Sequence, residues 1–458
     1  MVYLGALAAL SVSTLYGFLI LRSLDREKDI FFLESLGISY GIGLGLVSLV
    51  MTFMALAGLR YSVFSILTAA LFLPLILFFI TPRTGIKSPC LPDKFKPLEI
   101  LFLGFISWEV IYAFFRCLIK PIESYDAVAH WAFKAKAIYL FGGLPLDIFR
   151  RPIPADLIFT ADYPWLLPFS EAYIYNFLNS FNDFASKIII PLFFLFCIAL
   201  FYRLLKRQGL SRLHSLIFTF FLASIPQFNN YATIGYADLV LGFYYSFSFI
   251  YLYLWFKNGP RIFLLVSGIF AALAVYTKCE GMPLLLVNFL VFLMFIFFGK
   301  SYKKREDVKN FFLYLSIVVA LLIPALALKW ITSAGLENHT VNALAFSNFQ
   351  LSNIKRIPMI LYSYQKQFFG IKRWNILWII FFGTALCRFR KLLEGDKKYL
   401  TIGISLIFAG YTAVFILSPG PQEDLRTVSR LFLHFLPLIV FFVAEFLIPD
   451  RMKTDRKT

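Results

Sequence analysis

Residues 98–119 read LEILFLGFISWEVIYAFFRCLI, and residues 123–139 read ESYDAVAHWAFKAKAIY. The first stretch has the length and apolar character of a helix that spans a bilayer, which needs about 20 residues. The second places an Asp, a His and two Lys just beyond the end of that helix. These two neighbouring stretches indicate a membrane protein that gathers polar groups at the mouth of a spanning helix.

The composition of the whole chain supports a membrane protein. The 458 residues are 60% hydrophobic and 15% charged, whereas soluble domains are about 45–50% apolar and about 25% charged. The apolar runs do not alternate with a period of two, which argues against an outer-membrane barrel. The five cysteines are scattered without a CxxC pair, so a structural metal or disulfide framework is not expected. An all-α polytopic membrane protein is therefore predicted.

Apolar runs predict about thirteen transmembrane helices. The first begins at the N-terminus and is interpreted as a retained helix, because a basic region and a small-residue cleavage signature are missing there. The predicted spans are 2–21, 36–57, 61–80, 98–119, 187–205, 213–228, 236–256, 261–277, 282–298, 310–331, 374–389, 399–418 and 431–448.

The segments between these spans fall into two sets. Alternate connections are short and hold most of the Lys and Arg residues. This distribution accounts for the net charge of +18 without a nucleic-acid partner. Because basic connections lie on the inner side of a membrane, these connections are predicted to be cytoplasmic. The other set contains two long exterior segments, at about 120–186 and 332–373. The apolar piece at 165–181 contains Glu171 and two Asn, so an interfacial or re-entrant helix is expected there. Residues 449–458 form a basic cytoplasmic tail.

The stretch 126–139 is predicted to be an amphipathic helix on the exterior membrane surface. At α-helical spacing, Asp126, His130 and Lys134 share one face, and Trp131 and Ile138 lie on the apolar side. Asp126 is also a good N-cap residue. The plainer interpretation is that Asp126 only caps the helix and that the two basic side chains are only solvated. The alternative is that this polar face belongs to a site.

Further polar residues recur at the exterior ends of other predicted spans, where they can converge. Asp238 is expected to be an N-cap or a second carboxylate, and Lys278 an interfacial lysine or a cation for a phosphate headgroup. Arg430 can grip a phosphate with two N–H groups. His434, one turn deeper, is expected to face protein or a cavity, and Glu109 in the fourth span is expected to orient that helix. The other residues of the predicted substrate-binding set are Tyr125, His130, Lys134, Asp162, Tyr163 and Glu280.

In their order, these motifs resemble the GT-C superfamily of integral membrane glycosyltransferases. The resemblance is to the bacterial branch of protein O-mannosyltransferases and the aminoarabinose transferase. It rests on Tyr125-Asp126, His130 to Lys136, Asp162-Tyr163-Pro164, residues 235–238, residues 277–281 and Ser429-Arg430. It covers residues 98–448, so that residues 1–97 stand as three additional N-terminal helices. The mannosyltransferases carry Asp-Glu where this chain has Asp126-Ala127.

The resemblance implies a membrane glycosyltransferase, for a hexose or a pentose, in a bacterial or archaeal plasma membrane. The enzyme would move a sugar, with inversion, from a polyprenyl-phosphate carrier to a lipid, glycan or protein acceptor on the exterior face. Asp126 would be the catalytic carboxylate. Asp126 and Asp238 are the expected ligands if a divalent cation, Mg²⁺ or Mn²⁺, takes part.

Two other functions remain open from the sequence. A flippase or transporter of lipid-linked glycans would share the membrane location, although such proteins often show internal repeats and broken helices near mid-membrane. A polysaccharide polymerase or ligase would share the polyprenyl carrier. The substitution Asp126→Asn separates these alternatives from a transferase that depends on this carboxylate.

Overall fold

The computed structural model describes residues 2–80, 94–149, 163–299, 304–333, 351–417 and 427–448, and within these ranges the regular structure is entirely helical. Eight helical stretches are long and apolar enough to cross a membrane. They are α1 (Val2–Leu24), α2 (Phe32–Leu56), α4 (Pro97–Ile119), α8 (Asp183–Ser186) with α9 (Ile189–Arg207), α12 (Asp238–Phe256), α14 (Gly281–Phe298), α15 (Lys304–Ser333) and α20 (Lys397–Leu417).

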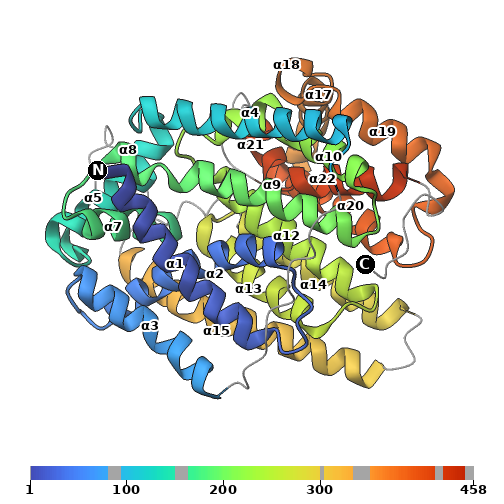
Figure 1. The fold of residues 1–458 in the computed structure, drawn as a ribbon. Helices are drawn as coiled ribbons and strands as arrows, with labels where there is room; N and C mark the ends of the chain where they lie inside the picture. The colour runs from blue at the N-terminus through green and yellow to red at the C-terminus, as the bar shows by residue number, and fades with distance from the viewer. Residues whose placement is uncertain are drawn as a thin grey trace.

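Five apolar helices are shorter, and together with the long ones they coincide with every span that the sequence predicts. These are α3 (Val63–Ile80), α10 (Arg212–Ala223), α13 (Arg261–Thr277), α19 (Leu377–Cys387) and α22 (Leu436–Leu447). The predicted fold class, an all-α multi-pass membrane protein, is confirmed. Figure 1 shows the long helices running side by side across the molecule.

Short helices connect the spans. They are the π-helix η1 (Ala127–Ala132), α5 (Phe133–Phe141), α6 (Leu146–Phe149), α7 (Leu166–Leu178), α11 (Pro226–Tyr231), the 3₁₀-helix η3 (Leu351–Arg356), α17 (Ile357–Phe368), α18 (Ile371–Trp374), the 3₁₀-helix η4 (Phe389–Lys391) and α21 (Val428–Leu433). The helix α7 has 13 residues, about 20 Å of length. An interfacial or re-entrant helix was predicted at 165–181, and α7 lies there; its burial among α1, α2 and α5 does not fit an interfacial helix.

The helix α12 forms the centre of the bundle. All of its residues except Trp255 are buried, and it packs against α9, α13, α14 and α22. Helices that are apolar on every side are expected in such a position. The N-terminal helices also pack closely: a Cβ added to Gly17 of α1 would overlap the backbone of Ser39 in α2. Small residues permit this close approach between spanning helices.

Ion pairs join the basic connections at one end of the bundle. Arg207, at the end of α9, bonds to Glu34 near the start of α2 at 2.6 Å, and Lys257, directly after α12, bonds to Glu445 of α22 at 3.1 Å. The opposite end of α12 begins with Asp238, and a helix of 19 residues is about 28 Å long. The two ends of this bundle are thus separated by roughly the thickness of a hydrocarbon core.

Candidate active site

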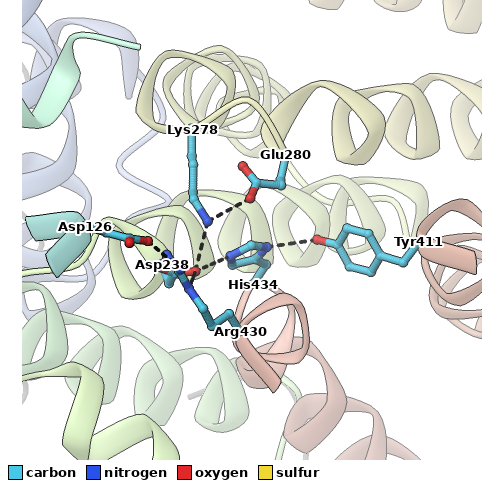
Figure 2. A network of polar contacts seen from close by, with 7 residues as sticks. All are labelled: Asp126, Asp238, Lys278, Glu280, Tyr411, Arg430 and His434. Carbon is cyan, nitrogen blue, oxygen red and sulfur yellow. Dashed lines mark hydrogen bonds and ion pairs between the residues drawn. The ribbon is translucent and has the colours of Figure 1, made fainter. Parts of the chain in front are cut away.

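Five segments far apart in the sequence meet at the end of the bundle where α12 begins. They are the turn before η1, the start of α12, the connection between α13 and α14, the helix α21 and the middle of α20. Figure 2 shows their polar side chains pointing toward one another, with Asp126 at one edge and Tyr411 at the other. Of the predicted site residues that the structure describes, Tyr125 lies apart from this cluster, and the others lie in it or beside it.

Arg430 lies between two carboxylates. Its Nη1 donates a hydrogen bond of 2.5 Å to Asp126 Oδ2. Its Nη2 and Nε donate to Asp238 Oδ2 and Oδ1, at 2.9 Å and 3.3 Å. The ring of Tyr236 lies 4.7 Å from the centre of the guanidinium group. Paired, charge-assisted bonds of this kind fix the plane of an arginine.

Asp238 is the buried support of the cluster. Its side chain is fully buried, and Oδ1 also accepts a bond of 3.0 Å from Lys278 Nζ and contacts His434 Nε2 at 3.0 Å. Lys278 bonds in addition to Glu280 Oε1 at 2.8 Å. A buried carboxylate is tolerated only when its charge is compensated and its lone pairs are used. Asp238 satisfies both conditions.

A hydrogen-bonded chain continues from Asp238 through His434 to α20. His434 Nδ1 lies 3.0 Å from the hydroxyl of Tyr411 on α20. In a neutral His434 with its proton on Nε2, the ring donates to Asp238 and accepts from Tyr411. The expectation that His434 faces protein is confirmed, because its side chain is fully buried. This chain holds the orientation of the Asp238 carboxylate.

Close approaches of backbone bring these groups together. A Cβ on Gly242, one turn after Asp238, would lie 2.7 Å from the carbonyl oxygen of Leu433, so only glycine lets α12 approach the α21–α22 junction this closely. Gly235 has a φ of +83° and packs against Ala127 of η1. Lys187 Nζ donates to the carbonyl oxygens of Lys120 and Pro121, which anchors the turn that leads to Asp126.

His130 and Lys134 have a different role from the predicted one. Both are buried, so the expectation that they form an aqueous face with Asp126 is wrong. The His130 ring stacks on Tyr163 at 4.9 Å, and Lys134 Nζ donates to the Tyr163 carbonyl at 2.8 Å and lies over the ring of Trp165. Residues 127–132 form a π-helix, whose i to i+5 bonding changes the angular spacing on which an α-helical projection depends.

Two capping predictions are also wrong. Asp126 makes no side-chain capping bond to η1, because its Oδ2 is bonded to Arg430. Asp238 is the first residue of α12, after the N-cap Ala237. In both cases the carboxylate bonds across the bundle to another segment, so neither residue is explained by local helix capping.

Burial changes the acid–base behaviour around the cluster. Burial lowers the pKa of His130 despite the nearby Asp126 carboxylate. Burial alone would also lower the pKa of Lys278, but the charges of Asp238 and Glu280 raise it overall. Burial would raise the pKa of Glu280, and Lys278 lowers it instead. Tyr163 has a strongly raised pKa because of its burial and the nearby acidic groups. Lys278 and Glu280 are therefore a charged pair, and His130 and Tyr163 are neutral.

The remaining predicted residues lie at the margin. The side chain of Tyr125 is 56% exposed, and Asp162 lies outside the described residues. Tyr411 was missed by the sequence reasoning, since it is one of several hydroxyl residues in the apolar run of α20 and no pattern distinguishes it. Glu109 accepts a bond of 2.8 Å from Asn229, which ties α4 to α11 as expected for an orienting residue.

The carboxylates do not fit the divalent cation that the sequence suggested. The space between Asp126 and Asp238 is occupied by the guanidinium of Arg430, and both oxygens of Asp238 accept bonds from basic side chains. Within the described ranges, three or more His, Cys, Asp or Glu side chains do not gather anywhere in a way that could hold a metal ion. The site is built as an ionic network of side chains.

Comparisons with known proteins give no family and one structural similarity. No protein-family model matches the chain, and a search of curated proteins gives no match. Among solved structures, the chain is similar to the Archaeoglobus fulgidus oligosaccharyltransferase in complex with Zn and sulfate, with a TM-score of 0.48 and 13% identity. The similarity covers 75% of this chain and 48% of that chain, so this chain spans about half the length of the archaeal protein.

Proposed function

We propose that this protein is a membrane glycosyltransferase that moves a sugar from a polyprenyl-phosphate donor to an acceptor hydroxyl. The proposal follows the order of motifs between residues 98 and 448, and residues 1–97 add packing helices to that module. The site would lie on the exterior face of the membrane, since the basic connections gather at the other end of the bundle.

One observation carries the proposal. Three members of the ionic network have partly exposed side chains: Asp126 at 23%, Arg430 at 20% and Glu280 at 27% exposure. Asp126 and Arg430 are bonded to each other, whereas Glu280 is bonded to the buried Lys278. Behind them, Asp238 is fully buried and Lys278 is 4% exposed. The arrangement thus places the Asp126 carboxylate and the Arg430 guanidinium side by side within reach of a ligand, on a rigid support. A base for a hydroxyl and a donor for a phosphate are what transfer from a sugar phosphate requires.

The apolar surface beside the site supports a prenyl donor. The outward surface of η1 and α5 carries exposed Val128, Phe133, Leu140 and Phe141. Apolar side chains at this position favour contact with acyl or prenyl chains. The phosphate of such a donor would then reach the level of Arg430, while its prenyl chain stays in apolar surroundings.

The proposed reaction is a single displacement. The acceptor O–H gives its proton to the Asp126 carboxylate, and the acceptor oxygen forms a bond to the anomeric carbon of the sugar. The bond between that carbon and the phosphate oxygen breaks, and its electron pair stays on the phosphate. Arg430 stabilises the charge that develops there. Inversion at the anomeric carbon follows from attack opposite the leaving phosphate, and Asp126 afterwards returns its proton to water.

Lys278 has a supporting role in this proposal. Its ammonium group is buried and bonded to Asp238 and Glu280, so it lacks the exposure expected of a direct headgroup ligand. It balances the charge of Asp238, which in turn holds Arg430. The reaction as written uses no metal ion.

The experiment is transfer by purified protein in detergent or liposomes. We expect mass spectrometry of co-purified lipid to find a polyprenyl phosphate carrying one sugar, and we expect Asp126→Asn to reduce transfer by at least about 100-fold. Asp183→Asn is the matched control, because Asp183 forms a comparable partly exposed pair with Lys136 at 2.8 Å. Full transfer by the Asp126→Asn protein would refute the mechanism. Movement of an intact lipid-linked glycan without bond cleavage would favour the flippase.

A further inference from the structure

The two sides of Arg430 are held very differently. Nε and Nη2 bond to Asp238, which is buried and itself bonded to Lys278 and His434. Nη1 bonds to Asp126 alone among the contacts described here. The Asp126 side chain is partly exposed. The first side is fixed by the network, whereas the second faces a partner that can leave toward solvent.

The proposed base and the proposed phosphate ligand are bonded to each other in this structure. Asp126 Oδ2 accepts a bond of 2.5 Å from Arg430 Nη1, which is a charge-assisted bond. A donor phosphate that binds Nη1 must therefore take the place of Asp126 Oδ2.

The charge of the cluster makes a phosphate a competitor for the same group. Three carboxylates, Asp126, Asp238 and Glu280, face two permanent cations, Lys278 and Arg430. A phosphate that binds Nη1 while Asp126 stays in place adds a further anion to an already neutralised guanidinium. Departure of Asp126 removes that repulsion, so binding of the anion and release of the carboxylate are thermodynamically coupled.

The backbone around Asp126 is suited to such a movement. Asp126 makes no capping bond that ties its side chain to its own helix. It is followed directly by the π-helix η1, and π-helical turns are frequent at functional sites. Lys187 anchors the turn before Asp126, and the buried Lys134 holds α5 beyond η1, so a movement at Asp126 is confined to the short segment between them.

We propose that the Asp126–Arg430 ion pair is an exchangeable latch: the phosphate of the donor replaces Asp126 on Arg430 Nη1, and this exchange frees Asp126 to act as the base. The inference rests on the proposed function for the identity of the donor. It adds that the base becomes active only when a donor phosphate is bound, which protects the site from side reactions in the absence of donor.

The test is a binding measurement that needs no sugar transfer. The probe is geranylgeranyl phosphate, titrated into purified protein, with inorganic phosphate as a parallel arm. The proteins are the wild type, Asp126→Asn, and Asp183→Asn as the control that removes the same charge from another partly exposed pair. We expect Asp126→Asn to bind the prenyl phosphate about fivefold more tightly or better, since the competing carboxylate is gone, and Asp183→Asn to bind as the wild type does.

Each other outcome has a defined meaning. Equal or weaker binding by Asp126→Asn would overturn the latch while leaving the donor class intact, and equal tightening by both variants would overturn it in favour of a general charge effect. Absence of prenyl phosphate binding in all three proteins would overturn the proposed function itself. If inorganic phosphate binds as tightly as geranylgeranyl phosphate, the lipid-linked donor is overturned. The comparison of Asp126→Asn with Asp183→Asn would still test whether phosphate replaces Asp126 on Arg430.

A second measurement uses the wild type alone and does not depend on the folding of a variant. Hydrogen–deuterium exchange reports local opening of a segment. Release of Asp126 on addition of geranylgeranyl phosphate should raise the exchange of amides in residues 126–132, while residues 238–245 of α12 stay unchanged. Unchanged or slower exchange in residues 126–132 at saturating probe would contradict the latch.

Discussion

The approach of α12 to the junction of α21 and α22 offers a sharp test of how the site is assembled. A Cβ on Gly242 would lie 2.7 Å from the carbonyl oxygen of Leu433, whereas ordinary contacts begin at 3.4 Å. The variant Gly242→Ala must therefore separate these backbones by about 0.7 Å. His434 directly follows Leu433, and Arg430 lies one turn before it, so both side chains move away from Asp238.

The expected magnitude follows from overpacking. Insertion of a methyl group into a packed interior costs about 1–3 kcal/mol. Misplacement of a catalytic group by about 1 Å can cost about 100-fold in rate. We expect Gly242→Ala to lower the free energy of unfolding, measured with SDS in mixed micelles, by about 1–3 kcal/mol, and to lower sugar transfer by at least about tenfold.

Gly410→Ala is the matched control. Gly410 lies within α20, and a Cβ added there meets nothing within 4 Å. Replacement of a helical glycine by alanine is favourable by about 0.5–1 kcal/mol when space is free. The two variants should therefore change stability in opposite directions. If Gly242→Ala is as stable and as active as Gly410→Ala, the close approach at Leu433 does not hold the site, and the reasoning is refuted.

Three further predictions concern the ionic network. Asp238→Asn removes the negative charge that compensates Arg430 and Lys278, and it should lower the free energy of unfolding by about 3–5 kcal/mol in the same assay. Asp183→Asn, which breaks a partly exposed pair, should lower it by about 1 kcal/mol or less. Equal losses would contradict the buried role of Asp238. The pKa of Glu280 is lowered in the folded protein, so its pair with Lys278 stabilises the fold at pH values above the ordinary glutamate pKa of 4.5. This contribution is lost as the pH falls through the lower folded pKa. Glu280→Gln should therefore flatten the fall in the free energy of unfolding that the wild type shows between pH 5 and 3, and an unchanged pH profile would count against the pair. Tyr411→Phe removes the hydroxyl that contacts His434 at 3.0 Å and should cost about 0.5–1.5 kcal/mol; a more stable Phe variant would show that this hydrogen bond does not support Asp238.

The roles of individual polar residues were harder to predict than their location. The sequence marked Asp126, Asp238, Lys278 and Arg430 because each stands at the end of an apolar run. It could not show that Lys278 is buried against Asp238 and Glu280, since residues 40 positions apart are brought together only by the packing of α12 against α13. The assignment of Lys278 to a headgroup failed to anticipate that burial.

The stretch 123–139 shows the same limit at close range. Its helical character was predicted, but the side that faces the protein was not. His130 and Lys134 are turned inward onto Tyr163 and Trp165, and the exposed side carries Val128 and Phe133. A π-helical segment breaks the phase of the projection, and stacking partners supplied by another segment compensate the burial of the two basic residues.

The amino-acid sequence by itself determined the fold class, an all-α multi-pass membrane protein, and, among the described residues, the positions of the apolar helices and of the polar residues at their ends. These properties are local, because the cost of placing charges in a hydrocarbon core acts on each run of about 20 residues separately. Only the tertiary structure decided which carboxylate meets which cation, which of them is buried, and that Arg430 stands between Asp126 and Asp238. Those relations depend on helix packing over distances of up to 304 positions in the chain, and close backbone approaches such as that of Gly242 to Leu433 set them within a fraction of an ångström.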